Sequence, residues 1–470
     1  MEQLSPLDAA FLEAEDTDRH ASLAIASVAV IESPPPSQKD YVATIGARLR
    51  TIPRARQKVR RVPWDLGPPV WVDDPWFDLG YHLRRTALPA PGDDAALNRL
   101  VGRIMSQRLD RDRPLWESWV IEGLAGGRWA VLTKLHHCLA DGVSGAQLYG
   151  VLFSGSPEPD PEIPYQAPEL IPPPSMVSLL ADALADFVRF PVEQLRLLVG
   201  AARSPRRLMQ GLTGTARDLA ALAGRLWPAG PSSLSGSIGA QRRYGIARAS
   251  LPDVVAIGKA HGATVNDVAL TAISGAFRAL LLHRGEVPDT HTLRTLVPVS
   301  VRAKGDHDIL DNRVSLVLPF LPVDIADPIE ALAVVHSRLR EAKADGEAQA
   351  GQAVTELAAH EPFGPVSWMI RLATRLPQHS IITVTTNVPG PREPLYVLGR
   401  KVVELQPYVP IALRLRIGVA VMTYCDQMVF GITADYDSTS EVDLLTGAIE
   451  SGIAELSAAS RPRRAKAKQR

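Results

Sequence analysis

The sequence predicts a mixed α/β (α+β) protein built from two units that each combine helices with a sheet. The chain has 470 residues, which is too long for a single hydrophobic core. Patterns typical of strands and of amphipathic helices occur on both sides of a proline-rich stretch. Two such units suggest two sheets that meet at a cleft, where ligand sites tend to form.

The composition excludes several classes of protein. Residues are 46% hydrophobic and 22% charged, which is typical of a globular protein with a large core. The 51 basic and 51 acidic residues cancel, so binding of nucleic acid through bulk charge is not expected. Only Cys138 and Cys425 are present, which favours a reducing compartment. We expect neither a signal peptide nor a spanning stretch of about 18 to 20 apolar residues.

Residues 1–155 form the first predicted unit. Runs of β-branched and apolar residues predict strands, and apolar residues three and four positions apart predict helices. The predicted elements are a strand at 23–31, a helix at 94–109, strands at 116–123 and 128–136, and a helix at 143–153. The two later strands flank Leu124-Ala125-Gly126-Gly127, which is typical of a β-hairpin.

Residues 156–238 are predicted to be a proline-rich and helical linker. The stretch 156–174 contains eight prolines, which exclude helix interiors and favour an extended chain. Residues 175–227 have helical periodicity and many arginines. A basic amphipathic helix can lie on a membrane surface, whereas a connector packed on the body would expose a solvated basic face. The sequence leaves both interpretations open.

Residues 239–460 form the second predicted unit, and residues 461–470 form a tail with six basic residues and no acidic one. The same periodicities predict helices and strands in this unit. The predicted helices are 251–260, 264–283, 329–343 and 442–456, and the predicted strands are 293–301, 313–321, 381–386, 415–424 and 428–436.

The segment His136-His137-Cys138-Leu139-Ala140-Asp141-Gly142 follows a strongly apolar strand and carries the candidate chemistry. Neighbouring strand residues point to opposite faces, so one histidine can serve as a base while the other packs on the far side. Asp141 is expected on a tight loop, where it can orient an imidazole or meet an arginine. Gly142 lets the backbone pass without a Cβ atom.

Other chemistries fit this motif less well. Histidine and aspartate are zinc ligands, but adjacent strand residues diverge and no HExxH or paired-cysteine spacing occurs. The run Gly142-Val143-Ser144-Gly145-Ala146 lacks the last glycine of a serine-hydrolase elbow, and no phosphate-loop or dinucleotide fingerprint is present. A histidine with a pKa of about 6.5 suits removal of a proton from an alcohol that attacks a carbonyl.

The chain resembles one known family from end to end. The motif HHxxxDG at 136–142 is the signature of the CoA-dependent acyltransferase superfamily. Further motifs are similar to those of the bacterial wax ester synthase/diacylglycerol acyltransferase family within it. These are Leu4-Ser5-Pro6-Leu7-Asp8 with Phe11, Pro114-Leu115-Trp116, Thr264-Val265-Asn266-Asp267-Val268, residues 297–302, Asn312-Arg313-Val314-Ser315, residues 386–391, and Phe430-Gly431 with Asp435.

The resemblance implies two chloramphenicol-acetyltransferase-like mixed-sheet domains joined by a helical linker, with the active site at their interface. It implies that His137 is the general base, beside His136 of the same motif. Asp141 would be structural and paired with Arg302. Asn266, near the expected start of a helix, could help to hold the site or the oxyanion.

Further candidates have both a functional and a structural interpretation. The residues that could face the cleft from the second unit, or form a turn before a Pro-Gly pair, are Thr385, Thr386 and Asn387. The residues that could line an acyl channel are Pro114, Leu115 and Trp116. Trp116 could equally be a core residue. Asp267 forms a T-x-x-D capping pattern with Thr264, which explains this aspartate without a catalytic role.

One stretch departs from the family pattern. Where relatives often carry small residues and glycine, this chain has Leu413, Arg414 and Arg416. These side chains could reshape an acyl pocket or contact a phosphate of CoA.

The resemblance implies an O-acyltransferase that moves a long-chain acyl group from acyl-CoA, its co-substrate, to diacylglycerol and so forms triacylglycerol. A long-chain alcohol is the alternative acceptor, and a carrier-protein-dependent condensation-type acyltransferase is a further alternative. A lipid-binding or droplet protein is the alternative outside enzymes. No bound cofactor or metal is expected. A lipid acceptor predicts a cytoplasmic protein peripherally associated with the inner membrane face or with lipid droplets. Acyl length and oligomeric state stay open.

Overall fold

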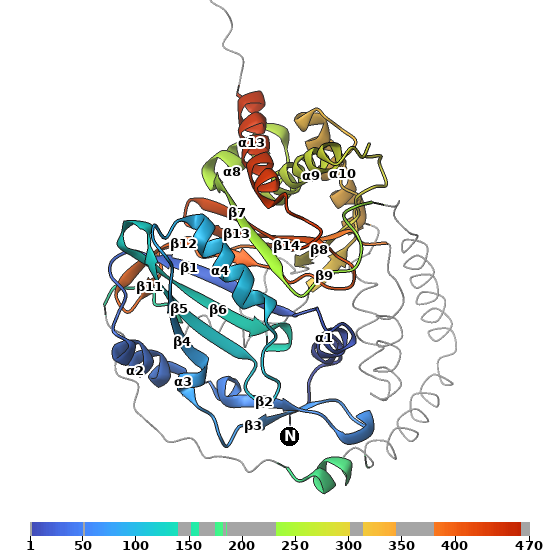
Figure 1. The fold of residues 1–470 in the computed structure, drawn as a ribbon. Helices are drawn as coiled ribbons and strands as arrows, with labels where there is room; N and C mark the ends of the chain where they lie inside the picture. The colour runs from blue at the N-terminus through green and yellow to red at the C-terminus, as the bar shows by residue number, and fades with distance from the viewer. Residues whose placement is uncertain are drawn as a thin grey trace, which may run out of the picture.

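The structure is a computed structural model, and it describes residues 2–49, 52–139, 152–158, 174–181, 185, 232–300, 314–344 and 380–461. This part of the chain contains two six-stranded sheets, a separate two-stranded sheet and helices that cover them (Figure 1). The α-helices are α1 (Pro6–Thr17), α2 (Gln38–Leu49), α3 (Leu79–His82), α4 (Asp94–Ser106), α8 (Leu251–His261), α9 (Val265–His283), α10 (Pro328–Ala344) and α13 (Val442–Ser460). The expected mixed α/β fold class is confirmed.

The first sheet has the strand order β11-β12-β1-β6-β5-β4. Its strands are β1 (Ala24–Ile31), β4 (Leu83–Ala87), β5 (Trp116–Leu124), β6 (Arg128–His136), β11 (Tyr396–Val397) and β12 (Arg400–Tyr408). Strands β1, β5 and β6 and helix α4 occur where the sequence predicts them. The turn between β5 and β6 contains Gly126 and Gly127, whose positive φ angles of 78° and 70° favour glycine there.

The second sheet has the strand order β7-β14-β13-β10-β8-β9. Its strands are β7 (Arg242–Ser250), β8 (Thr295–Ser300), β9 (Val314–Val317), β10 (Thr383–Val388), β13 (Ile417–Tyr424) and β14 (Gln427–Asp435). The sheet is mixed, because β10 pairs in parallel with β8 and β13 while β14 pairs antiparallel with β13 and β7. All of these strands except β7 occur in segments that the sequence predicts as strands.

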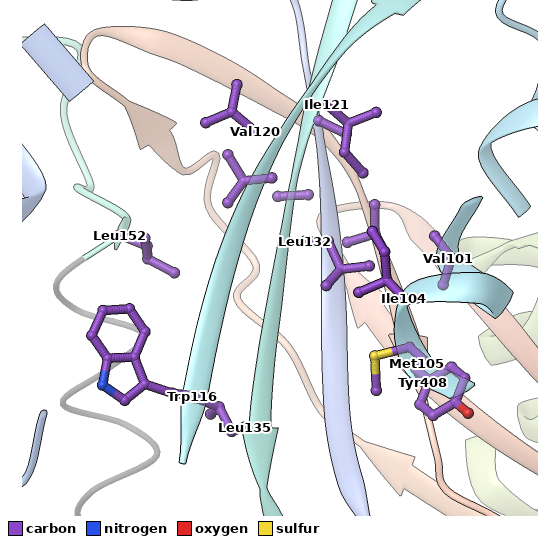
Figure 2. Packing of buried hydrophobic residues seen from close by; sticks show 14 of the residues in the cluster. Val101, Ile104, Met105, Trp116, Val120, Ile121, Leu132, Leu135, Leu152 and Tyr408 are labelled. Carbon is purple, nitrogen blue, oxygen red and sulfur yellow. The ribbon is translucent and has the colours of Figure 1, made fainter. Parts of the chain in front are cut away.

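Strand β12 crosses the expected boundary between the two units. It lies within residues 239–460, yet it pairs antiparallel with β1 in the first sheet. Tyr408 at its end joins Ile104 and Met105 of α4 in the first hydrophobic core (Figure 2). The charged and polar residues of β12 hide its strand pattern, which is why the sequence does not predict it. The first sheet is therefore built from both predicted units.

Glycines allow the two units to approach closely where they meet. A Cβ atom at Gly431 of β14 would lie 1.8 Å from the carbonyl oxygen of Pro407 in β12. The hydroxyl of Tyr244 donates to that same oxygen at 2.8 Å. A Cβ atom at Gly102 of α4 would lie 2.6 Å from the carbonyl oxygen of Arg242 in β7. The contact is close-packed at two independent places.

Helix α9 is the core helix of the second unit. It is long and apolar enough to span a membrane by length and composition alone, but 67% of the relevant window is buried inside the protein. Thr264 and Asp267 form the expected capping box, in which Asp267 Oδ2 accepts from Thr264 N at 2.8 Å and Thr264 Oγ1 accepts from Asp267 N at 3.2 Å. The structural interpretation of Asp267 is confirmed.

Some predicted segments lie outside the described residues. They are residues 143–151 of the helix predicted after the histidine motif, most of the linker 156–238 including the greater part of 175–227, and the tail from 462 onward.

Candidate functional site

The two histidines of the motif lie where strand β6 ends. That strand ends at His136, and a short 3₁₀ helix, η4 (His137–Leu139), follows. The backbone N–H of His136 donates to Leu115 O at 2.9 Å, and that of His137 donates to Leu23 O at 3.0 Å. The residues that precede β5 and β1 therefore hold the two histidines in place.

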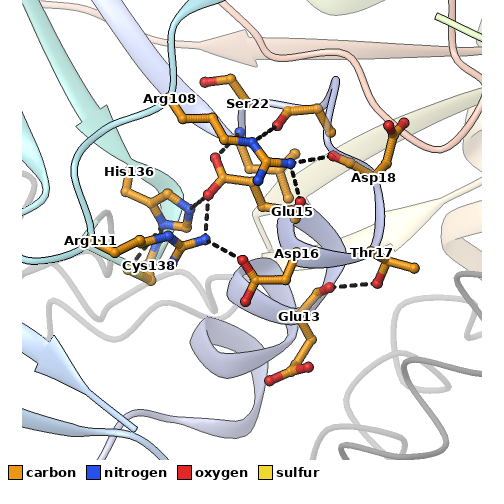
Figure 3. Close-up of polar contacts among 12 residues, drawn as sticks. Glu13, Glu15, Asp16, Thr17, Asp18, Ser22, Arg108, Arg111, His136 and Cys138 are labelled. Atoms are coloured by element: carbon orange, nitrogen blue, oxygen red, sulfur yellow. Dashed lines mark hydrogen bonds and ion pairs between the residues drawn. The ribbon is translucent and has the colours of Figure 1, made fainter.

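His136 is buried, with 1% of its surface exposed. Its Nδ1 accepts a hydrogen bond from Cys138 N at 3.2 Å, which leaves the proton of the neutral ring on Nε2. This Nε2 lies 3.5 Å from Oε2 of Glu15 on helix α1 (Figure 3). Burial lowers the pKa of His136, so the ring is neutral near pH 7.

Glu15 is the centre of a polar network that fixes α1 against the motif. Its buried carboxylate pairs with Arg111 and accepts from Leu23 N at 2.9 Å. Burial raises the pKa of Glu15, but contacts with His136 and Arg111 outweigh burial and lower it to about 2. Because His136 is neutral near pH 7, Arg111 is the cation that balances the carboxylate. Arg108 donates to carbonyl oxygens of α1 and of the turn after it (Figure 3).

His137 is half-buried and stacks on Phe11 of α1. The ring centroids are 3.9 Å apart and the planes differ by 22°. Burial lowers the pKa of His137 to about 4, and the neighbouring His136 adds to the shift. The neutral ring, which is the form that accepts a proton, therefore dominates near pH 7.

Both rings contact helix α1, which differs from the divergence expected of two adjacent strand residues. The reason is that only His136 belongs to the strand, whereas the backbone turns into η4 at His137. Phe11 and Glu15 are four residues apart, so they lie on the same face of α1. The sequence assigns no role to Phe11 or Glu15. Their i, i+4 spacing is the only local signal that the two side chains lie together.

Of the remaining motif residues, Cys138 and Leu139 belong to the described part of the chain and are buried. Burial raises the pKa of the Cys138 thiol, so the thiol stays protonated and is a poor nucleophile. Asp141, Gly142 and Arg302 lie outside the described residues. The pairing of Asp141 with Arg302 therefore stays a prediction.

A cavity of about 720 Å³ lies on the second unit. Its walls come from the first turns of α8 and α9, from the segment after β10 and from the turn between β13 and β14. Asn266 and Asn387 both line the cavity, and Asn387 Nδ2 donates to Asn266 Oδ1 at 3.0 Å. Two predicted site residues are therefore in direct contact. His137 is not among the described residues that line this cavity.

The two threonines before Asn387 do not line this cavity. Thr385 is only 2% exposed, and its Oγ1 accepts a hydrogen bond from Thr295 Oγ1 at 3.0 Å. This hydrogen bond links β8 to β10, so the Thr385 hydroxyl is occupied by a contact between strands rather than at the cleft. Thr386 is half-buried on the same strand.

The proposed acyl-channel residues are part of the first hydrophobic core. Leu115 and Trp116 are buried, and Pro114 beside them is buried as well. Trp116 Nε1 donates to Ala55 O at 2.6 Å, and its ring stacks on His82 with centroids 4.4 Å apart (Figure 2 shows Trp116). These contacts support the core interpretation of Trp116, and a channel beside it stays a prediction.

The unusual stretch before β13 packs against α1. Leu413 contacts a small apolar cluster that also involves Phe11. Leu413 and Arg414 have positive φ angles of 51° and 71°, a costly conformation for residues other than glycine. Arg416 donates to the carbonyl oxygen of Ser233 at 2.9 Å. Leu413 therefore packs beside the helix that contacts His137, whereas Arg416 contacts the segment before β7. A contact of these side chains with CoA stays a prediction.

The described residues contain no group of three or more His, Cys, Asp or Glu side chains that could hold a metal ion. The candidate site consists of a half-buried histidine at the end of β6 and of a pair of asparagines at the start of α9 and the end of β10.

Two family models match the sequence. The model described as the wax ester synthase/diacylglycerol acyltransferase catalytic domain matches residues 4–269. The model described as the WS/DGAT C-terminal domain matches residues 310–457.

Named relatives are similar over almost the whole chain. A protein of Mycobacterium tuberculosis named "Probable diacyglycerol O-acyltransferase tgs1" is 43% identical over 474 residues, which covers 99% of this chain and 97% of the relative. A second protein of that species, named a putative diacyglycerol O-acyltransferase, is 38% identical and covers 98% of this chain and 92% of its own length.

Solved structures support the same architecture. The wax ester synthase/diacylglycerol acyltransferase from Marinobacter aquaeolei VT8 is 27% identical, with a TM-score of 0.66 over 97% of this chain and 99% of that chain. A starter condensation domain of rhizomide synthetase in complex with C8-CoA has a TM-score of 0.55 at 14% identity, covering 98% of this chain and 94% of that chain. This second likeness supports the fold alone.

Proposed function

The chain belongs to the wax ester synthase/diacylglycerol acyltransferase family, and from this we infer that it is an O-acyltransferase that moves an acyl group from acyl-CoA to diacylglycerol. The product is triacylglycerol. The observation that carries this inference is the 43% identity, over 99% of the chain, to a protein named a diacylglycerol acyltransferase.

His137 is our proposed general base. The diacylglycerol hydroxyl gives its proton to the neutral imidazole while its oxygen attacks the thioester carbonyl. The carbon–sulfur bond then breaks, and the imidazolium gives the proton to the departing thiolate of CoA. Burial of the ring, which lowers its pKa to about 4, supports rapid release of that proton. The stack on Phe11 supports a fixed ring orientation.

Asn266 is our proposed donor to the oxyanion. Its Oδ1 already accepts from Asn387, so the Nδ2 group is the part that would donate. Asn266 also lies in the first turn of α9, where backbone N–H groups and the helix dipole favour negative charge. The cavity beside it has room for part of a substrate. The proposal requires this cavity and His137 to come together when acyl-CoA binds.

The acceptor is tested with the purified protein and one acyl-CoA, offered in parallel with diacylglycerol, hexadecanol and water. We expect triacylglycerol as the main product. Wax ester as the main product would assign the chain to the alternative acceptor, and free fatty acid would indicate a thioesterase. Activity that requires a loaded carrier protein instead of acyl-CoA would support a condensation-type enzyme. Lipid binding without any product would support a droplet protein.

Acyl-CoA is the proposed co-substrate, and the proposed reaction needs no bound cofactor or metal. Diacylglycerol and triacylglycerol partition into apolar phases, which supports the expected peripheral position at the inner membrane face or on lipid droplets. Fractionation of cells that express the protein at native level tests this location.

A further inference from the structure

The two-stranded sheet is a hairpin that packs on the first unit through buried residues such as Trp71 of its second strand. Its strands are β2 (Gln57–Arg60) and β3 (Val70–Asp73), and they pair only with each other among the named strands (Figure 1). The loop that joins them carries Trp64, which is 81% exposed, and Leu66, which is 37% exposed. Large apolar side chains that are exposed together on one surface can mark an interaction site.

The backbone at this loop holds Trp64 outward at a cost. Trp64 and Asp65 have positive φ angles of 55° and 53°. Residues other than glycine rarely adopt this conformation, and such strain collects at functional positions. Two unfavourable features therefore coincide at Trp64, namely a strained backbone and an exposed indole.

A helix whose first described residues are 176–181 extends the apolar surface. It packs on the hairpin through Leu179, which is 2% exposed and clusters with Val70 and Val72 of β3. On this helix, Met176 is 52% exposed and Val177 is 76% exposed. The hairpin and this helix therefore pack together. Their exposed apolar side chains, Trp64, Leu66, Met176 and Val177, are here called the hairpin surface.

Basic residues flank the hairpin surface, and most of those that the structure describes are ion-paired. Residues 41–64 contain no acidic residue and seven basic ones, namely Arg48, Arg50, Arg54, Arg56, Lys58, Arg60 and Arg61. Four of these side chains are ion-paired: Arg54 with Glu2, Arg56 with Asp73, Lys58 with Asp74 at 3.3 Å, and Arg61 with Glu13, Asp16 and Asp65. The side chain of Arg60 donates to the carbonyl oxygen of Pro174 at 3.1 Å, directly before the helix that carries Met176.

The hairpin surface is also tied to the helix that supports His137. Arg61 pairs with Glu13 at 3.3 Å and with Asp16, both on α1. The backbone N–H of Leu4, just before α1, donates to Pro69 O at 2.8 Å. A lipid surface that contacts the hairpin would therefore lie next to the helix that carries Phe11 and Glu15.

We propose that the hairpin surface docks the protein on a lipid surface, with Trp64 inserted among the headgroups. Indole rings prefer the boundary between apolar and aqueous phases. The proposal rests on the proposed function, because an enzyme that acts on diacylglycerol must reach its acceptor in a lipid phase. It assigns the contact to described residues 57–73 and 176–181.

The test uses the full chain and vesicles of phosphatidylcholine with an equal amount of phosphatidylglycerol. The variant is Trp64→Ser, and the matched control is Val287→Ser, since Val287 is 90% exposed and lies on the second unit after α9. We expect wild type and control to bind vesicles alike, and Trp64→Ser to bind at least tenfold more weakly. Trp64→Phe should retain most of the binding.

An activity split separates docking from chemistry. With hexanol and a short-chain acyl-CoA, both water-soluble, Trp64→Ser should turn over like wild type. With diacylglycerol in vesicles it should lose activity in proportion to its lost binding. Vesicle binding that is equal in Trp64→Ser and wild type, or absent from wild type, overturns the proposal. Loss of self-association in Trp64→Ser with unchanged vesicle binding also overturns it, because the surface would then join copies of the chain.

Failure of the docking proposal and failure of the proposed function give different results. If wild type binds vesicles through Trp64 but makes no ester from any acceptor, the docking proposal stands and the proposed enzymatic function is wrong. If wild type makes triacylglycerol and Trp64→Ser binds vesicles as well as wild type, the proposed enzymatic function stands and the docking proposal is wrong.

Discussion

At the scale of single residues, His136 and His137 differ in burial, and this difference is one reason why His137 is the proposed base. His136 is buried and contacts Cys138 and Glu15, whereas His137 is half-buried and stacks on Phe11. The sequence could predict that one histidine packs and the other acts, because the motif follows an apolar strand. It could not predict Glu15 as the partner of His136, because the two residues lie far apart in the sequence and meet only through tertiary packing.

Replacement of His137 tests the proposed base. For His137→Ala we expect turnover with acyl-CoA and diacylglycerol to fall by about a hundredfold or more, the usual range for loss of a general base. The half-buried position of the ring predicts only a modest loss of stability. Steady-state kinetics with urea unfolding of the same samples provides the measurement. A variant with wild-type turnover would remove His137 from the mechanism.

Glu15 should contribute stability that depends on acid. Its folded pKa of about 2 lies below the ordinary value of 4.5, so this stabilisation is present above pH 4.5 and is lost as the pH falls toward 2. The loss should be about 2 to 4 kcal/mol, since one pKa unit corresponds to about 1.4 kcal/mol. Urea unfolding of wild type and Glu15→Gln between pH 6 and pH 2, at intervals of about half a unit, should show a flatter curve for the variant.

The matched control is Glu393→Gln, because Glu393 is exposed. Its pH dependence should follow wild type. Parallel curves for Glu15→Gln and wild type would show that Glu15 is not the titrating group.

At the scale of elements, the sequence predicts the helices and strands that have a clear periodicity. It does not predict the strands that depend on tertiary contacts. Strands β5 and β6 and helices α4, α9 and α13 have strong apolar patterns and occur as expected. Strands β7 and β12 have several charged residues and were not predicted. Each is stabilised by pairing with a strand from a distant part of the sequence. The same limit applies to the site. Asn266 and Asn387 are both predicted site residues, but their direct contact, across 121 positions, does not follow from the sequence.

The crossing of β12 and β14 gives a sharp stability prediction. For Gly431→Ala we expect a loss of roughly 3 kcal/mol or more, because the new Cβ atom would lie 1.8 Å from the carbonyl oxygen of Pro407 and the backbone must move. The control is Gly275→Ala in the middle of α9, where a Cβ atom meets nothing within 4 Å. That change should stabilise by up to about 1 kcal/mol through helix propensity. Urea unfolding measures both, and a Gly431→Ala variant as stable as wild type would contradict the close crossing.

At the scale of the whole molecule, the shared strand β12 should make the two units unfold together. It pairs with β1 in the first sheet and packs on β14 of the second, so neither unit can lose it without disturbing the other. Thermal unfolding followed by tryptophan fluorescence, which mainly reports residues 64–129, should coincide with the loss of helix followed by circular dichroism. Two separate midpoints would show that the units are independent, as linked domains often are.

The same strand has a consequence for how the protein is made. Ile31 of β1 pairs with Val402, which follows it by 371 positions (402 minus 31). At about 5 to 20 residues per second, a ribosome needs roughly 20 to 75 s to add that length. During this interval one side of β1 exposes unpaired N–H and C=O groups, through which nascent chains can aggregate. The yield of folded enzyme therefore depends on how well β1 is shielded until its late partner is synthesised.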